Sequence, residues 1–244
     1  MSCSWTGSSD RFFHFILEKM NIGIVGAGFI GGALARPLTR LGHRITIANS
    51  RGPHTLGAVA AQTGAMPGTI EQAVHGQELV IVSIPQKAIP GLPKALFGVL
   101  PVELSVIDTG NYYRHRDGIL PEIEAGLPES RWVEKHLGHP VIKVFNTIYW
   151  TEIAGLAKPA GASGRVALPV AGDDPEAKRQ VLTLVDALGF DGLDAGSIDD
   201  SWRQQPGTPI YALYTDLARA REALAAARLD KVTEYRVRAT SKPD

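Results

Sequence analysis

Three glycines near the start of the chain have the spacing of a phosphate-binding turn. The segment Gly26-Ala27-Gly28-Phe29-Ile30-Gly31 matches G-x-G-x-x-G. In that pattern the first glycine makes a tight turn, the second lets the backbone approach a pyrophosphate, and the third lets the following helix pack closely. The start of that helix would offer unpaired N–H groups and a partial positive charge to the phosphates. The alternative is a glycine-rich turn that binds nothing, because the pattern is common by chance.

A second segment could select the form of the dinucleotide. Ala48-Asn49-Ser50-Arg51-Gly52-Pro53 contains no acid, whereas an NAD site usually has a carboxylate here that accepts hydrogen bonds from the ribose. Ser50 offers a hydroxyl, and Arg51 offers a planar fork of donors that suits a phosphate. We therefore predict that Asn49, Ser50 and Arg51 bind NADP(H) in preference to NAD(H). A solvated loop arginine is the alternative for Arg51.

Further candidate residues follow later apolar runs. Ser83, Ile84 and Pro85 end the run 79–85, Asn111 follows 105–108, and Asn146 with Thr147 follows 141–145. Ligands of open α/β sheets bind beyond the carboxyl ends of the strands. The predicted cofactor-binding residues are therefore the six of the glycine turn, the three after residue 48, and Ser83, Ile84, Pro85, Asn111 and Asn146.

The elements that would position these residues alternate between strand and helix. Strands are predicted over 21–26, 44–48, 65–66, 79–84, 105–108 and 141–145, and helices over 29–41, 56–62, 70–74 and 87–97. Near-continuous apolar strands separated by helices are typical of a parallel sheet covered on both faces. We therefore predict an α/β protein with a Rossmann-type, doubly wound, mostly parallel sheet.

The second half of the chain is predicted to complete the same domain. A strand over 165–171, a helix over 174–188 and a strand over 190–194 are expected to extend the same sheet, and a helix is expected over 217–228. The polar tail from Lys231 is predicted to be poorly ordered. We expect a disordered extension over 1–19, with Met20 as a hypothetical native start, a single NADP-binding domain over 20–230, and a tail over 231–244.

Composition excludes several classes of protein. Lys+Arg and Asp+Glu number 25 each, so no basic field exists to bind nucleic acid or an anionic membrane. The single cysteine, Cys3, excludes an intramolecular disulfide and fits a reducing compartment. The apolar stretch 12–17 is too short to span a bilayer. We expect a cytoplasmic protein with neither nucleic acid nor membrane as partner.

The chain resembles the NADP oxidoreductases that depend on coenzyme F420, a deazaflavin hydride carrier, and their predicted dinucleotide-binding relatives. The resemblance lies in Ile22-Gly23-Ile24-Val25-Gly26-Ala27-Gly28, Ala48-Asn49-Ser50-Arg51-Gly52-Pro53, Ser83-Ile84-Pro85, Phe145-Asn146-Thr147-Ile148, Pro169-Val170-Ala171-Gly172-Asp173-Asp174 and Asp194-Ala195-Gly196. It implies a reductase domain in which Ser83, Ile84 and Pro85 lie beside the nicotinamide, with F420 as a candidate co-substrate.

Two features depart from this family and leave the acceptor open. Asn146 stands where the deazaflavin-using members have a histidine, and the segment 202–209 is added. That segment brings Trp202, Arg203 and two amides, Gln204 and Gln205, close to Tyr211 and Tyr214. It could close the pocket or recognise a polar ring, or it could be an ordered loop packed on the sheet or a dimer contact. Asn111 could position the carboxamide or the substrate, while Tyr112 and Tyr113 could cap the core.

A hydride transfer between two stacked rings needs alignment more than a strong acid or base. We therefore predict an NADP(H)-dependent oxidoreductase with a planar small-molecule acceptor and leave its catalytic residues unknown. The alternatives are a reductase of flavins, quinones or imines, in which Tyr112, Tyr113 or a histidine would donate a proton, and a non-catalytic NADP(H)-binding redox sensor. A homodimer could complete the site.

Metal binding is not expected. His136 and His139 have a spacing that can bind a metal, but the pattern predicts a solvated loop. Asp173, Asp174 and Glu176 precede a predicted helix, where acids cap the backbone and interact with the helix dipole.

Overall fold

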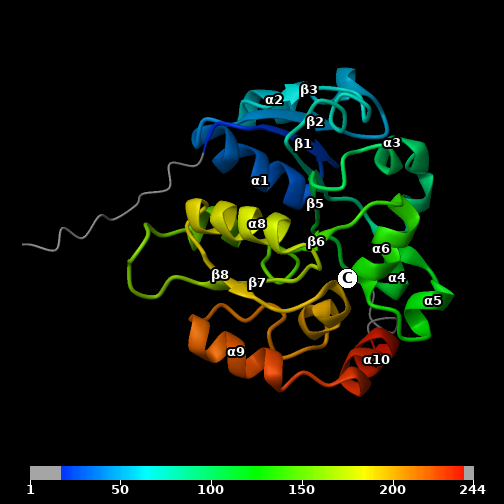
Figure 1. Ribbon diagram of the computed structural model, residues 1–244, viewed down its shortest axis with the longest axis vertical. Coiled ribbons are helices and arrows are strands. Elements are labelled where there is room, and N and C mark those ends of the chain that lie inside the picture. Colours follow the sequence, from blue (N-terminus) through cyan, green and yellow to red (C-terminus); the bar gives the residue numbers. More distant parts are fainter. Residues whose placement is uncertain (1–17, 239–244) are drawn as a thin grey trace, which may run out of the picture.

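Six parallel strands form the central sheet of the computed structural model, which describes residues 18–238 (Figure 1). The strands are β1 (Asn21–Val25), β2 (Arg44–Ala48), β3 (Met66–Pro67), β4 (Leu79–Val82), β5 (Ser105–Asp108) and β6 (Ile142–Lys143). Their order is β3-β2-β1-β4-β5-β6. The strands β1 to β3 extend the sheet in one direction and β4 to β6 extend it in the other, so the topological switch point lies between the neighbouring strands β1 and β4. The predicted fold class is confirmed, and this switch point is the place where such sheets bind ligands. The predicted extension over 1–19 lies almost entirely outside the described residues.

Helices cover both faces of the sheet because successive strand residues point to opposite sides. One core contains Ile22 and Ile24 of β1 beneath α1 (Phe29–Arg40) and α8 (Pro175–Ala187). The other contains Val80 and Val82 of β4 beneath α3 (Lys94–Gly98) and α6 (Glu129–Leu137). The fully buried apolar runs were therefore correctly interpreted as central strands.

The last two strands do not continue the main sheet as predicted. β7 (Ala167–Val170) and β8 (Asp191–Asp194) form a separate parallel pair. One antiparallel bridge, between Lys143 and Ala171, joins this pair to β6. Phe145 has a φ of 64°, so the predicted strand over 141–145 is cut to two residues and offers no ladder for β7.

Two predicted helices are interrupted. Residues 70–76 form turns, with the side chain of Gln77 donating to the Gln72 carbonyl. The predicted helix over 87–97 is divided into the 3₁₀ helix η2 (Gln86–Gly91) and α3, because Pro90 and Pro93 provide no N–H for a continuous ladder.

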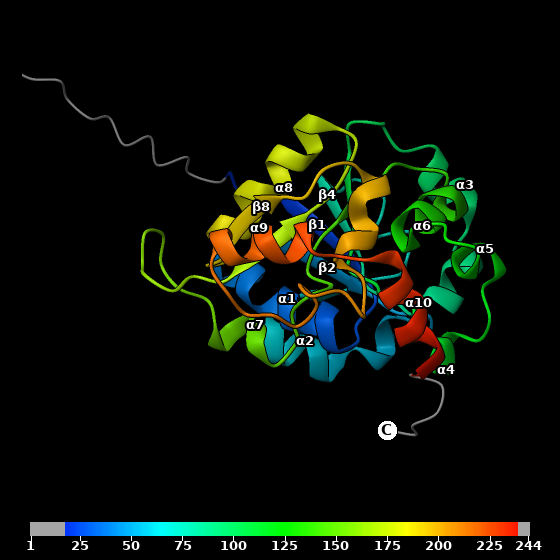
Figure 2. The ribbon, with the colours of Figure 1, turned by 90° about the horizontal axis from the view of Figure 1, so that it is seen from below.

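The predicted disordered tail is instead partly helical. α10 (Leu229–Arg238) buries Val232 and Arg236 against the body of the molecule, and Figure 2 shows it beside α4 and α5. The remaining elements are η1 (Pro53–Thr55), α2 (Gly57–Thr63), α4 (Arg114–Asp117), α5 (Pro121–Glu124), α7 (Glu152–Gly155), η3 (Ile198–Gln204) and α9 (Leu217–Ala225). Between residues 18 and 238, no helix is both long and apolar enough to cross a membrane.

Candidate dinucleotide and acceptor cleft

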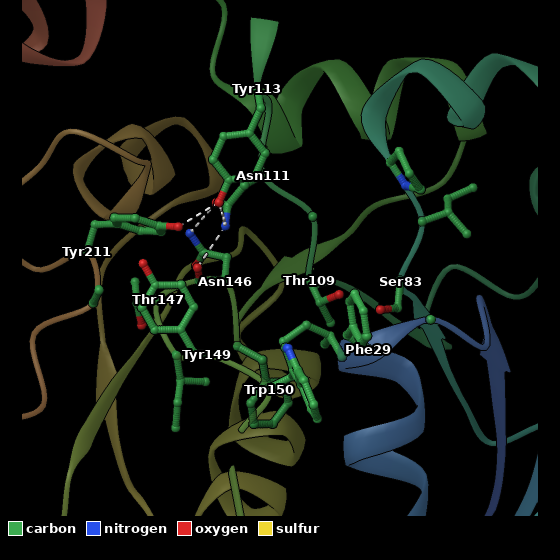
Figure 3. A pocket seen from close by; sticks show the side chains of 18 of the residues that line it. Phe29, Ser83, Thr109, Asn111, Tyr113, Asn146, Thr147, Tyr149, Trp150 and Tyr211 are labelled. Carbon is green, nitrogen blue, oxygen red and sulfur yellow. Dashed lines mark hydrogen bonds between the residues drawn. The ribbon is translucent and has the colours of Figure 1, made fainter. Parts of the chain in front are cut away.

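A cleft of about 490 Å³ opens at the carboxyl edge of the central sheet (Figure 3). It is lined by residues 28–30, 83–85, 109–111 and 145–150, together with Tyr113, Arg116, Tyr211 and Ala212. Eight of the fourteen predicted cofactor-binding residues lie in this wall: Gly28, Phe29, Ile30, Ser83, Ile84, Pro85, Asn111 and Asn146. The fold therefore brings together segments that lie far apart in the sequence.

The glycine turn has the geometry of a phosphate cradle. Gly26 has a φ of 118°, and a Cβ there would come within 2.1 Å of the Ser83 carbonyl oxygen. A Cβ on Gly31 would come within 1.9 Å of the Gly26 carbonyl oxygen, so α1 packs tightly against β1 only without a side chain. A Cβ on Gly28 would meet nothing within 4 Å. The open space before α1, whose first turn has no acid, fits the pyrophosphate of a dinucleotide.

The residues predicted to select NADP(H) lie at the carboxyl end of β2, outside the wall of the cleft. The Asn49 side chain donates to the Thr55 hydroxyl at 2.9 Å and accepts from the Arg51 backbone N–H at 2.9 Å. Asn49 therefore shapes the loop. Ser50 and Arg51 are exposed, and the guanidinium makes no ion pair or side-chain hydrogen bond with residues 18–238. An exposed cation with no competing acid fits a 2′-phosphate.

Ser83, Ile84 and Pro85 form the part of the wall nearest the glycine turn. The Ser83 N–H donates to the Val25 carbonyl at 2.8 Å, which continues the β1–β4 pairing by one residue. The strand β4 ends at Val82, and Pro85 is the N-cap of η2. These residues lie where a nicotinamide beyond the sheet edge would be held.

A network of amides crosses the opposite part of the cleft. The Asn146 Nδ2 group donates to Asn111 Oδ1 at 3.0 Å and to the Gln204 carbonyl at 2.7 Å, and Gln204 Nε2 donates to Asn146 Oδ1 at 2.9 Å. Both amide hydrogens of Asn146 are therefore used within the protein. Its geometry suits orienting Asn111 better than donating to a ligand. Gln204 was expected only as one of the two amides of the added segment 202–209, and its bond to Asn146 was not predicted.

A buried ion pair supports the loop that carries Asn111. Lys143 Nζ lies 3.0 Å from Asp108 Oδ2 and also donates to the Gly110 carbonyl. Asp108 further accepts from the Ser130 hydroxyl at 2.7 Å and from the Gly110 N–H at 2.8 Å. Because both charges are paired and hydrogen-bonded, this pair fixes the loop after β5.

Tyr113 and Tyr211 are in contact at the end of the cleft opposite Ser83 (Figure 3). Their hydroxyl oxygens are 2.6 Å apart. Burial raises the pKa of Tyr113 to about 12, and burial followed by the neighbouring Tyr113 raises the pKa of Tyr211. The guanidinium of Arg116 lies over the Tyr113 ring, 4.9 Å from its centroid. Sequence analysis identified neither Tyr211 nor Arg116 as a site residue.

The sequence left open whether Tyr112 and Tyr113 cap the core or act in the site, and the structure gives the two residues different positions. Tyr112 is buried, and its hydroxyl bonds the Gly118 carbonyl and Glu124, so this residue caps the core. Tyr113, the next residue, faces the cleft. A strand-like step between neighbours sends their side chains to opposite sides.

Three aromatic residues form the rim of the cleft. Phe29 stacks on Trp150 with ring centroids 4.9 Å apart and an interplanar angle of 14°. These rings and Tyr149 are 73%, 44% and 53% exposed. Apolar rings at a cleft mouth provide a surface on which a planar ligand can stack. Tyr149 and Trp150 come two and three residues after Thr147, and this closeness to the predicted Asn146-Thr147 pair is the signal that would have found them.

The added segment 202–209 packs into the fold. η3 lies against α6, and Trp202 and Arg203 stack on each other outside the wall of the cleft. Gln204 alone connects the segment to the amide network. The ordered-loop interpretation is the one that the geometry favours.

The histidine pair is also structural. His139 is buried, with its ring nitrogens bonded to the Pro140 and Pro101 carbonyls, so the predicted solvated loop is wrong for this residue. His136 packs on the Trp132 ring. No group of three or more metal-ligating side chains is found in the described part of the chain.

The strand order and the cleft at the switch point define a Rossmann-type fold, the class in which dinucleotides bind at this edge of the sheet. Residues 21–112 match the family model described as NADP oxidoreductase, coenzyme F420-dependent. The resemblance is thus confirmed over β1 to the loop after β5. This part of the chain has the signature of the NADP-dependent oxidoreductases.

Solved structures share this fold, and curated proteins match parts of the sequence. A hypothetical protein of Sinorhizobium meliloti is 29% identical with a TM-score of 0.67, covering 80% of this chain and 94% of its own. A structure from an Arthrobacter species, assigned as an F420-dependent NADP reductase, is 22% identical with a TM-score of 0.60, covering 73% and 86%. The Escherichia coli protein YjhV is 55% identical over 53 residues, which are 22% of this chain and 39% of that protein. The chain spans 39% and 38% of the length of the curated relatives it matches.

Proposed function

We propose that the protein is an NADP(H)-dependent oxidoreductase that transfers a hydride between NADPH and a planar acceptor, with coenzyme F420 as the first candidate. The observation that carries this proposal is a combination of two features. The space in front of Gly28 is open to a phosphate, and at the end of β2 the exposed Arg51 has neither a neighbouring acid in the loop nor an ion-pair partner among residues 18–238. The family match over residues 21–112 and the likeness to a structure assigned as an F420-dependent NADP reductase support it.

Different residues would bind different parts of the cofactor. The backbone N–H groups of Gly28, Phe29 and Ile30 would hold the pyrophosphate at the start of α1. Ser50 and Arg51 would hold the 2′-phosphate. Ile84 and Pro85 would pack on the nicotinamide, and the bound cofactor supplies the hydride.

The acceptor would occupy the other half of the cleft. The rings of Trp150 and Tyr149 offer stacking surfaces there, and no aspartate or glutamate lines the wall. The ring of Phe29 stacks on the ring of Trp150 and supports its position. This surface suits a neutral or anionic planar ring and would align it for transfer.

Stopped-flow absorbance would test the proposal, with purified protein, NADPH and oxidised F420, and NADH as the control. Loss of NADPH together with deazaflavin reduction, and much slower oxidation of NADH, is the expected result. Tight NADPH binding without turnover of F420, flavins, quinones or imines would favour a redox sensor instead.

A further inference from the structure

The acceptor half of the cleft contains a pair of phenols whose hydroxyls touch. Tyr113 follows β5, whereas Tyr211 lies 98 residues later, and the two oxygens are 2.6 Å apart. Both side chains line the cleft, where Arg116 is the charged side chain of the wall. Asn111 Nδ2, which belongs to the amide network, lies 3.5 Å from the Tyr113 oxygen. The wall contains no histidine, cysteine, lysine or carboxylate, so its tyrosines are the groups best able to give up a proton.

We propose that Tyr113 is a catalytic acid of the hydride transfer, and that Tyr211 and Arg116 are positioning residues that stabilise its anion. The inference rests on the proposed function. It specifies the class of acceptor: a double bond or conjugated ring in which one atom, a carbon or a ring nitrogen, gains the hydride and a conjugated nitrogen or oxygen gains a proton. Imines, ketones, flavins and deazaflavins share this chemistry.

The surroundings of Tyr113 favour it over Tyr211 as the donor. The Arg116 guanidinium over its ring stabilises a phenolate, and so does a hydrogen bond from Tyr211. Burial raises the pKa of Tyr113 to about 12, and the Tyr211 hydroxyl and the Arg116 guanidinium act against that rise. Because the guanidinium lies over the Tyr113 ring, it favours ionisation of Tyr113 over that of Tyr211.

None of the other titratable groups around Tyr113 is placed to act as the acid in its stead. Tyr235 and the buried Glu129 act on it through space and raise its pKa. The ring of His115 lies 5.7 Å from the Tyr113 ring, and Asp117 accepts from the Tyr113 backbone N–H while pairing with Arg116. None of these four side chains lines the cleft.

The proposed step balances as follows. The hydride-accepting atom, a carbon or the ring nitrogen of a flavin, gains a hydrogen with two electrons, and the electron pair of its double bond moves through the conjugated system to the nitrogen or oxygen that is protonated. That atom forms a bond to the proton as the Tyr113 O–H bond breaks. The phenolate, held by Tyr211 and Arg116, then regains a proton from water. The overall reaction consumes one hydride and one proton.

Steady-state kinetics with four probes, each with NADPH, would test the step: coenzyme F420, FMN, 1-pyrroline and cyclohexanone. For whichever probes are reduced, Tyr113→Phe should lower kcat at least about 100-fold, the range for a general acid, and Tyr211→Phe about tenfold. KM for NADPH should stay within about twofold of the wild-type value in both. Tyr112→Phe is the matched control, because it deletes the neighbouring hydroxyl outside the cleft, and its kcat should stay within about twofold.

A second readout does not depend on turnover. A difluorotyrosine placed at position 113 has a more acidic phenol, whose ionisation can be followed by fluorine NMR. Tyr211→Phe and Arg116→Met should each raise the pKa of that phenol, and the alkaline limb of kcat/KM should move to lower pH with fluorination.

The outcomes separate this inference from the proposed function. Turnover that survives in Tyr113→Phe, or a fluorophenol pKa insensitive to Tyr211 and Arg116, would overturn the acid role while leaving the oxidoreductase proposal intact. Reduction of none of the four probes by the wild type, despite NADPH binding, would overturn both.

Discussion

Gly26 and Gly28 belong to one motif but are glycines for different reasons. Gly26 combines a left-handed φ with backbone contact to Ser83, so any side chain there would strain the fold. Gly28 has an ordinary φ of −81° and open space in front of it. Folding therefore does not require glycine at position 28, but a close approach of phosphate would.

Gly28→Ala should accordingly weaken NADPH binding at least about tenfold without lowering the melting temperature, since the new methyl group occupies the space of the pyrophosphate. The matched control is Gly32→Ala, at a helical glycine of α1 that also has nothing within 4 Å of an added Cβ. It should leave NADPH binding unchanged and stabilise α1 by about 0.5–1 kcal/mol. Fluorescence titration and thermal melts would measure both, and normal binding by Gly28→Ala would contradict the cradle.

Arg51 should determine the preference between the two cofactors. Arg51→Ala is expected to weaken NADPH binding by about 1.5–3 kcal/mol, the range for hydrogen bonds to charged groups, with little effect on NADH. Arg44→Ala, at the opposite end of β2 and also exposed, is the control and should change neither. Equal losses for both cofactors, measured by calorimetry, would rule out the 2′-phosphate contact.

At the scale of elements, α10 holds the acceptor half of the molecule in place. Arg236 is buried and donates to the Ile123 carbonyl at 2.9 Å and to Gln205 Oε1 at 3.1 Å, and it lies 3.3 Å from Glu129. Glu129 in turn accepts from the Tyr112 N–H. Through these bonds a helix remote from the glycine turn fixes the backbone next to Tyr113.

Loss of this arginine should destabilise the protein more than the loss of an exposed one. Arg236→Ala leaves Glu129 buried without its partner, so we expect a decrease of about 3–5 kcal/mol in the free energy of unfolding. Arg238→Ala, whose side chain is 81% exposed in a pair with Glu234, should change it by less than about 0.5 kcal/mol. Urea unfolding monitored by circular dichroism would compare them, and similar effects would remove the anchoring role of α10.

Elements with a local signal were predictable from the sequence, and elements defined by distant partners were not. The buried strands and α1 show as apolar runs and helical periodicity. α10 gives no such signal, because one of its two buried positions is an arginine whose partners, Glu129 and Gln205, lie far away in the sequence. The split of the sheet likewise depends on the unusual φ of Phe145.

The candidate site divides in the same way. Its cofactor half is a local motif, so Gly28 and Ser83 could be placed from the sequence alone. Tyr211 lies in an irregular segment, in which the next residue, Ala212, has a φ of 57° and donates its N–H to the Thr147 carbonyl. The contact between Tyr211 and Tyr113 depends on that tertiary bond, which no periodicity reveals.

In the whole molecule, two layers of structure meet at one cleft. The six-stranded sheet supplies the glycine turn and the residues after β4, while the segment that follows β8 supplies Tyr211, and Gln204 from the same segment bonds to Asn146 of the wall. Figures 1 and 2 show this later segment beside the sheet. A cofactor bound at the sheet edge would therefore face an acceptor held partly by the second half of the chain. In the proposed reductase, a common dinucleotide motif would therefore be combined with an acceptor site that belongs to this chain.

Titration calorimetry of the full chain with NADPH and with NADH tests the central claim most directly. We expect one NADPH to bind per chain, at least about tenfold more tightly than NADH, because Arg51 and Ser50 bind a phosphate that NADH lacks. Equal affinities, or tighter binding of NADH, would contradict it.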